Sequence, residues 1–151
     1  MKSKNFSFVY FFLIYLIPVL LSAQDISVHE FIGKPKSDVI KTFGNPVHQD
    51  NSNPEMMCMF YQTATLRMIF VSNKEGVYQS EATANYDTEV EARNVFENIL
   101  QNSKANGFAV DSISVNDYQI YKTGMRADLQ LTENKISKKF DVNIKARKSE
   151  N

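Results

Sequence analysis

Residues 125–132 read MRADLQLT, and residues 139–146 read KFDVNIKA. In each stretch every second side chain is apolar: Met125, Ala127, Leu129 and Leu131 in the first, and Phe140, Val142, Ile144 and Ala146 in the second. Successive side chains of a strand point to opposite faces, so this alternation predicts two strands with one buried face each. We therefore expect a sheet that is covered on one side and exposed to water on the other.

Five further stretches upstream have the composition of strands. They are residues 56–62, 65–71, 77–86, 108–115 and 118–122. In the third stretch Ser80, Ala82 and Ala84 share one face between Tyr78 and Tyr86. Because these side chains are small, a helix has room to lie close to the sheet at this strand.

Two segments predict helices. Residues 89–104 follow Thr88, which with Glu91 forms a capping box, and they carry an apolar stripe. The other segment, residues 29–46, reads HEFIGKPKSDVIKTFGNP. Pro35 suits the first turn of a helix, while Gly44 and Pro46 end it.

The predicted order of elements is helix, three strands, helix and four strands, joined by short turns. Short turns between neighbouring strands favour antiparallel pairing. The expected fold is therefore α+β, an antiparallel sheet with two helices on one face. Residues 47–54, VHQDNSNP, are polar and rich in turn formers, and we expect them to form a loop.

The N-terminus has the layout of a secretory signal peptide. Lys2 and Lys4 precede an apolar run over residues 9–21, and Ala23 precedes polar residues. We predict that residues 1–23 are removed after Ala23, which leaves one domain over residues 24–151 in the periplasm or secreted space. The alternative is a retained membrane anchor, but the run falls short of the ~20 apolar residues that a spanning helix needs.

The composition of the chain excludes several classes of partner. Seventeen Lys and Arg balance seventeen Asp and Glu, and removal of Lys2 and Lys4 leaves a formal charge of −2. This balance gives no electrostatic reason to expect nucleic acid or an anionic membrane as a partner. Cys58 is the only cysteine, so an internal disulfide is impossible and the fold depends on apolar burial.

Residues 31–46, FIGKPKSDVIKTFGNP, resemble the first helix of SmpA/OmlA-like domains. The order of elements after this helix is also similar to the related β-lactamase-inhibitor-protein-like fold. The resemblance implies an exported, non-catalytic protein that docks on another protein of the bacterial envelope. The chain departs from envelope-assembly members in lacking a lipid-modified cysteine, so the resemblance implies no membrane tether.

The residues offer little for catalysis or metal binding. Met57, Cys58 and Met59 are soft ligands suited to Cu(I), but on a strand Cys58 points away from both methionines. Neither His29 nor His48 has the second histidine of a zinc-protease motif, and no G-x-S-x-G sequence is present. We therefore predict no catalytic, cofactor or metal site, although a Ser-His-Asp arrangement of distant residues stays open.

Tyrosines are the most suggestive side chains, because they combine a large contact area with a polar tip. The candidate interaction surface comprises these tyrosines and two residues of the predicted loop: Tyr61, Tyr78, Tyr86, Tyr118, Tyr121, His48 and Asp50. In the alternative view each tyrosine packs separately at a sheet edge.

The leading hypothesis for function is an exported module that binds another envelope or extracellular protein through its open sheet face. One alternative is a carrier of a small apolar ligand between helix and sheet near Ala82 and Ala84. A second alternative is a hydrolase with an unrecognised site.

Overall fold

The structure, a computed structural model, describes residues 26–150. The predicted signal peptide, residues 1–23, lies outside the described residues. The described elements in chain order are η1 (Val28–Phe31), α1 (Lys36–Phe43), β1 (His48–Asp50), β2 (Met57–Gln62), β3 (Leu66–Asn73), β4 (Gly76–Tyr86), α2 (Glu89–Ala105), β5 (Ala109–Ser114), β6 (Asp117–Lys122), β7 (Met125–Glu133) and β8 (Phe140–Lys148).

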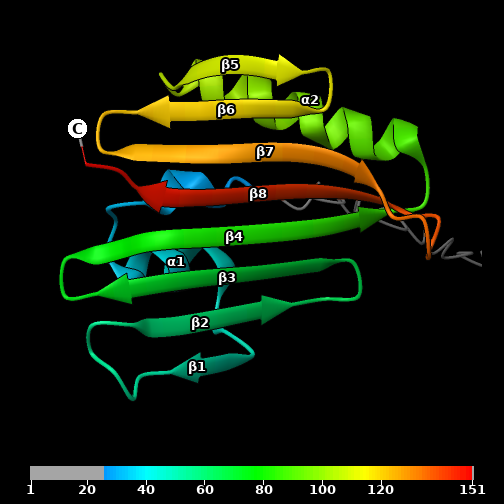
Figure 1. Cartoon of the computed structure of the whole chain (residues 1–151). Coiled ribbons are helices and arrows are strands. Elements are labelled where there is room, and N and C mark those ends of the chain that lie inside the picture. The colour runs from blue at the N-terminus through cyan, green and yellow to red at the C-terminus, as the bar shows by residue number, and fades with distance from the viewer. Residues whose placement is uncertain (1–25, 151) are drawn as a thin grey trace, which may run out of the picture.

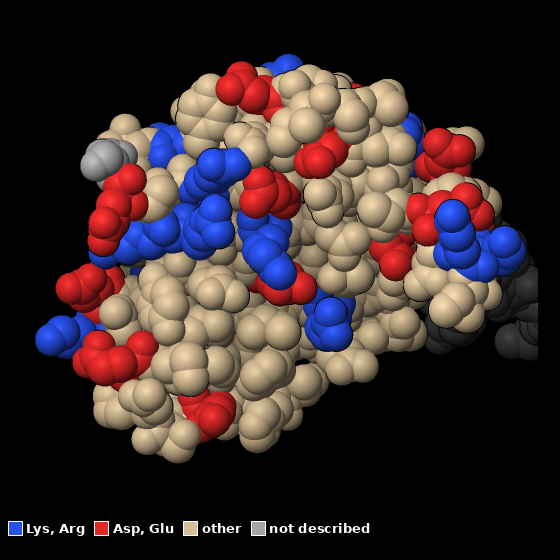
Figure 2. Space-filling view, in the orientation of Figure 1, with Lys and Arg blue, Asp and Glu red and all other residues tan. Residues whose placement is uncertain are grey.

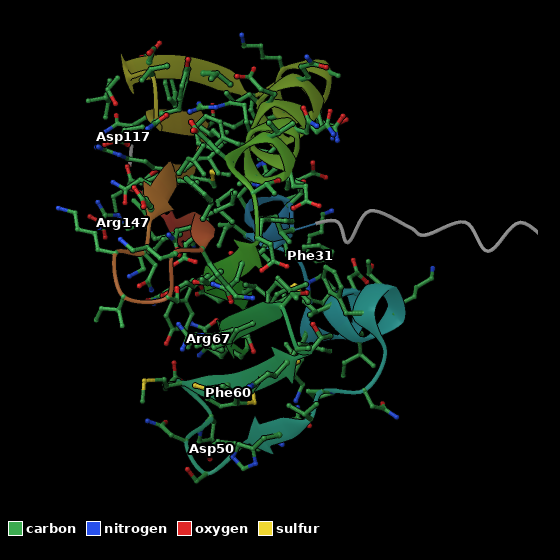
Figure 3. The ribbon with its side chains drawn as sticks, turned by 90° about the vertical axis from the view of Figure 1, so that its right-hand side faces the viewer. Phe31, Asp50, Phe60, Arg67, Asp117 and Arg147 are labelled. Carbon is green, nitrogen blue, oxygen red and sulfur yellow. The ribbon has the colours of Figure 1, made fainter. Side chains whose placement is uncertain are left out.

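All strands join one antiparallel sheet in the order β1-β2-β3-β4-β8-β7-β6-β5 (Figure 1). Strands β1 to β4 follow one another in the chain and are also neighbours in the sheet. Helix α2 then carries the chain to the far edge at β5, and β6, β7 and β8 return to pair with β4. Seen edge-on, both helices lie on one side of the sheet (Figure 3). The expected fold class, an antiparallel α+β sheet with two helices on one face, is confirmed.

Two local predictions are wrong. Residues 48–50 are not loop but a short edge strand, so four strands rather than three precede α2. The strand was not predicted because its three side chains are polar. It is held in the sheet by backbone pairing with residues 58–60 of β2. Pro35 stands in extended conformation just before α1 rather than in its first turn. Residues 28–31 form a separate 3₁₀ turn.

The segment between η1 and α1 is fixed to the hairpin that joins β3 and β4. Gly33 N–H donates to the Val77 carbonyl at 2.7 Å, and Val77 N–H donates to the Lys34 carbonyl at 2.9 Å. Gly76 makes this approach possible, because a Cβ there would lie 2.7 Å from the Lys34 oxygen. Its φ of +127° also favours glycine.

The core fills the space between the sheet and the helices. The predicted alternation in β7 and β8 is confirmed, with the apolar side chains buried and only Phe140 partly exposed. Phe70 of β3 anchors a ring cluster with Phe31, Phe43 and Tyr61 beside α1. The capping box of Thr88 and Glu91 begins α2 as predicted. Its buried stripe packs on the same face of the sheet: Ala92, Phe96, Ile99 and Leu100.

Candidate functional site

The face of the sheet opposite the helices, here called the open face, carries the alternate residues of every strand. Directly opposed residues form rows that cross the sheet from β1 to β5. The central row runs in sheet order through His48, Phe60, Ile69, Glu81, Lys145, Asp128, Gln119 and Asp111. In Figure 3 Phe31 lies on the helix side, whereas Arg67 and Arg147 lie on the open side.

The half of the open face formed by β1, β2 and β3 carries an apolar patch. The apolar patch consists of four partly exposed side chains on β2 and β3: Cys58, Phe60, Ile69 and Val71. Phe60 lies opposite Ile69, and Cys58 lies opposite Val71, so the four form a contiguous block. The His48 ring extends this block to the sheet edge, 5.5 Å from the Phe60 ring. Figure 2 shows this lower half of the face largely without charged side chains.

The other half is a polar strip, formed by the open-face residues of β4, β8 and β7. Lys145 Nζ lies 3.3 Å from the Glu81 carboxylate, and Asp128 stands opposite Lys145 on its other side. Arg126 and Arg147 face each other directly on β7 and β8. Exposed ion pairs stabilise a fold by less than about 1 kcal/mol, so these charges contribute little to folding.

Neutral polar side chains in the strip are fixed by hydrogen bonds across strands. Thr83 Oγ1 donates to Asn143 Oδ1 at 2.9 Å, and Asn85 Nδ2 donates to Asp141 Oδ1 at 2.6 Å. Two open hollows flank the Thr83–Asn143 bond. One of about 330 Å³ is lined in part by Glu81, Asp128 and Gln130, and one of about 290 Å³ in part by Arg67 and Thr83. The open face is therefore contoured as well as chemically divided.

The structure does not bring the predicted tyrosines together. Tyr61 is buried, and its hydroxyl donates to the Gly44 carbonyl at 3.0 Å. Tyr86 and Tyr118 pack against the core on the helix side. Tyr78 lies at a bulge between β3 and β4, where its hydroxyl donates to the Glu55 carbonyl at 3.3 Å. Only Tyr121 lies on the open face, 39% exposed.

The two predicted loop residues do reach the open face. His48 and Asp50 lie on β1 opposite Phe60 and Cys58, beside the apolar patch. The patch itself is not apparent from the sequence, because β2 is apolar on both faces and therefore lacks the period-2 alternation of polar and apolar residues. In β3, the exposed Arg67 and the buried Met68 point to opposite faces of the sheet.

Cys58 is not set up as a nucleophile. Burial raises the pKa of its thiol, and the charge of Asp50 raises it further. Hydrogen bonds from the Ser52 side chain and backbone hold the pKa of the Asp50 carboxyl below its usual value, so that charge persists. A thiol with a raised pKa carries little thiolate near neutral pH.

Metal binding by the sulfur residues does not fit the geometry either. Met59 is fully buried on the helix side, whereas Cys58 lies on the open face. Within residues 26–150 no group of three or more His, Cys, Asp and Glu side chains is arranged to hold a metal ion.

A serine–histidine contact exists, but in the interior of the protein. Ser103 Oγ lies 2.9 Å from Nε2 of His29, and its own proton goes to the Ile99 carbonyl at 2.7 Å. Ser103 is 0% and His29 1% exposed. A substrate cannot reach a hydroxyl that is closed off in this way, so the pair is structural.

The proposed carrier site between helix and sheet is filled by side chains. Ala82 and Ala84 are 0% and 3% exposed, and Phe96 and Ile99 of α2 are 0% and 3% exposed. All four belong to one core cluster. This packing argues against an apolar ligand at that position.

Comparison with known proteins gives no family. No family model matches the chain, and no curated protein matches it. Similar solved structures include a cysteine-rich secretory protein from Staphylococcus aureus subsp. aureus Mu50, at 10% identity and a TM-score of 0.45. Another is an extracellular protein containing a SCP domain from Bacillus anthracis str. Ames, at 11% identity and a TM-score of 0.46.

These two alignments cover 80% and 83% of this chain but 45% and 47% of the other proteins. The chain thus spans less than half the length of either protein. At these TM-scores a shared fold is not established. Separately, none of the helices within residues 26–150 has the length and apolarity to cross a membrane.

Proposed function

We propose that this protein is an exported, non-catalytic module that binds another protein of the bacterial envelope or secreted space through its open face. The observation that carries the proposal is the division of that face. A contiguous, partly exposed apolar patch on β2 and β3 lies directly beside the hydrogen-bonded polar strip on β4, β8 and β7.

This arrangement has the anatomy of a protein interface. Apolar side chains such as Phe60 and Ile69 supply contact area that a partner can remove from water. Fixed charges such as Glu81, Lys145 and Arg147 then select the partner and its orientation. The enclosed Ser103 and the raised pKa of Cys58 argue against the hydrolase alternative.

Affinity capture with matched variants tests the proposal. Wild type, Val71→Asp and Arg147→Glu serve as baits in an envelope extract of the organism that encodes the chain, and the captured protein is identified, purified and titrated. A charge placed in the patch by Val71→Asp should weaken binding by about tenfold or more. The new carboxylate would lose its hydration when the partner binds and would gain no partner charge or hydrogen bond in return. Ile136→Asp, at a side chain 96% exposed on the β7–β8 loop, is the matched control.

The outcomes that support the proposal differ from those that contradict it. Equal affinities for all four proteins would contradict the proposed surface, and so would weaker binding by Ile136→Asp alone. Export is tested on the same material: N-terminal sequencing should find Gln24 as the first residue. A chain that begins at Met1 would contradict cleavage without affecting the binding result.

A further inference from the structure

Two arginine side chains face each other directly on the open face. Arg126 of β7 lies opposite Arg147 of β8, and both side chains are exposed. Directly opposed side chains on adjacent strands have Cβ atoms about 5 Å apart, and like charges in such a pair destabilise a sheet. The fold therefore holds two positive charges together although their repulsion works against it.

The arginine pair is incompletely neutralised by its neighbours. Within residues 26–150 no ion pair includes Arg147. Its neighbour on β4 is the uncharged Gln79, and the neighbour of Arg126 on β6 is Tyr121. Asp128 is the carboxylate closest along the strand, but its Oδ1 lies 3.8 Å from Arg126 Nε, which is too long for a hydrogen bond.

The adjacent row of the open face differs, because its charges alternate in sign. Glu81, Lys145 and Asp128 follow one another across β4, β8 and β7, with 3.3 Å between Lys145 Nζ and the Glu81 carboxylate. On these three strands the two rows together carry three cations, Lys145, Arg126 and Arg147, against two carboxylates. Figure 2 shows Lys and Arg side chains gathered over β7 and β8. The excess positive charge belongs to the arginine pair.

The arginine pair also lies close to the apolar patch. In sheet order its row runs Val71, Gln79, Arg147 and Arg126, so one uncharged residue separates the patch from the pair. Neighbouring strands lie about 4.8 Å apart, which places Arg147 about 10 Å from Val71 across the sheet. One protein interface of ordinary size covers both.

We propose that Arg126 and Arg147 together bind a carboxylate of the partner protein, from an Asp or Glu about 10 Å from the apolar residue that covers the patch. A guanidinium group presents paired N–H donors that match the two oxygens of a carboxylate. A carboxylate between the two arginines also offsets the repulsion present in the free protein. The inference rests on the proposed function, because it assigns the chemistry of the partner at the same face.

Selection from a random peptide library displayed on phage tests the inference, with the purified protein as target. Peptides selected by wild type should be enriched in Asp and Glu together with apolar residues. The double variant Arg126→Gln/Arg147→Gln should lose the acidic enrichment, and Arg126→Glu/Arg147→Glu should select Lys and Arg instead. Lys41→Gln/Lys104→Gln removes the same charge from exposed positions on α1 and α2, and should select as wild type does.

A synthetic copy of the most enriched peptide gives the affinities. It should bind the Arg126→Gln/Arg147→Gln protein about tenfold more weakly than wild type. Changing its acidic residue to the amide should weaken binding to wild type by a similar factor, with little further effect on the double variant. Circular dichroism checks that each variant is folded.

An absence of acidic enrichment over the unselected library would overturn the inference, as would enrichment that Arg126→Gln/Arg147→Gln retains or that Lys41→Gln/Lys104→Gln loses equally. A peptide weakened by Val71→Asp but not by loss of both arginines would contradict the carboxylate site alone and leave the proposed function intact. A peptide that depends on the arginines but binds Val71→Asp as tightly as wild type would instead count against the apolar patch.

Discussion

Ser103 Oγ lies 2.9 Å from Nε2 of His29, and this buried contact joins helix α2 to the 3₁₀ turn at the start of the described chain. Because the Ser103 proton is donated to the Ile99 carbonyl, the histidine ring donates its Nε2–H to the serine oxygen. The His29 ring also packs edge-on against Phe108, 5.1 Å between centroids. Residues far apart in the sequence thus hold the first turn onto the helix layer.

Ser103→Ala should therefore destabilise the fold. The substitution leaves a buried ring N–H without its acceptor, which costs about 1–3 kcal/mol. Urea unfolding measures the loss, with Ser137→Ala in an exposed loop as the control. A change in unfolding free energy no larger than that of the control would contradict a structural role for the pair.

Gly76→Ala should be more damaging than Gly124→Ala. Both glycines have positive φ, but a Cβ at Gly76 would lie 2.7 Å from the Lys34 carbonyl oxygen, whereas at Gly124 no atom lies within 4 Å. Gly124→Ala should therefore lower the free energy of unfolding only by the strain of a non-glycine residue at positive φ, about 1–2 kcal/mol. Gly76→Ala should lower it further, because the new Cβ must also displace the Gly33–Lys34 segment. Equal midpoints of thermal unfolding would show that this segment is not fixed to the hairpin.

Tyr61 and Tyr121, both candidates for one surface, should respond differently to loss of the hydroxyl. Tyr61→Phe removes a partly buried hydrogen bond to Gly44 and should lower the free energy of unfolding by about 1 kcal/mol. Tyr121→Phe removes a surface contact to Asp111 and should cost less than about 0.5 kcal/mol. Chemical denaturation of the two variants under the same conditions distinguishes them, and the reverse order would contradict their assigned positions.

Asp50→Asn should make Cys58 more reactive. The Asp50 charge contributes to the raised pKa of the thiol, so its removal lowers that pKa and increases the thiolate fraction at a given pH. Burial, the larger cause, remains, and the pKa should stay above its usual value. The pH profile of iodoacetamide alkylation should shift to lower pH in the variant. An unchanged profile would mean that Asp50 does not act on the thiol.

The fold could be predicted where the sequence alternates clearly. Residues 125–131 and 140–146 gave the buried face of two strands, and Thr88 with Glu91 gave the start of α2. Strand β1 could not be predicted, because its three residues are polar and its backbone pairing with β2 leaves no pattern in the sequence. Sequence order also could not reveal that β8 lies between β4 and β7, since this depends on where α2 places β5.

The candidate site was only partly predictable, for a related reason. His48 and Asp50 were identified and do reach the open face, although on a strand. The tyrosines were grouped by residue type, but their direction depends on register, and Tyr86 and Tyr118 turn to the helix side. Phe60 and Ile69 belong to runs that are apolar on both faces, so only pairing shows which side chains face water.

The central claim is that the open face is the working surface, and photo-crosslinking in living cells tests it most directly. A photoreactive amino acid replaces Val71 on the open face, or Glu97 on the helix side, in the full chain. The account predicts a crosslinked partner from position 71 and none from position 97. Adducts from position 97 alone, or to the same partner at equal yield from both positions, would contradict it.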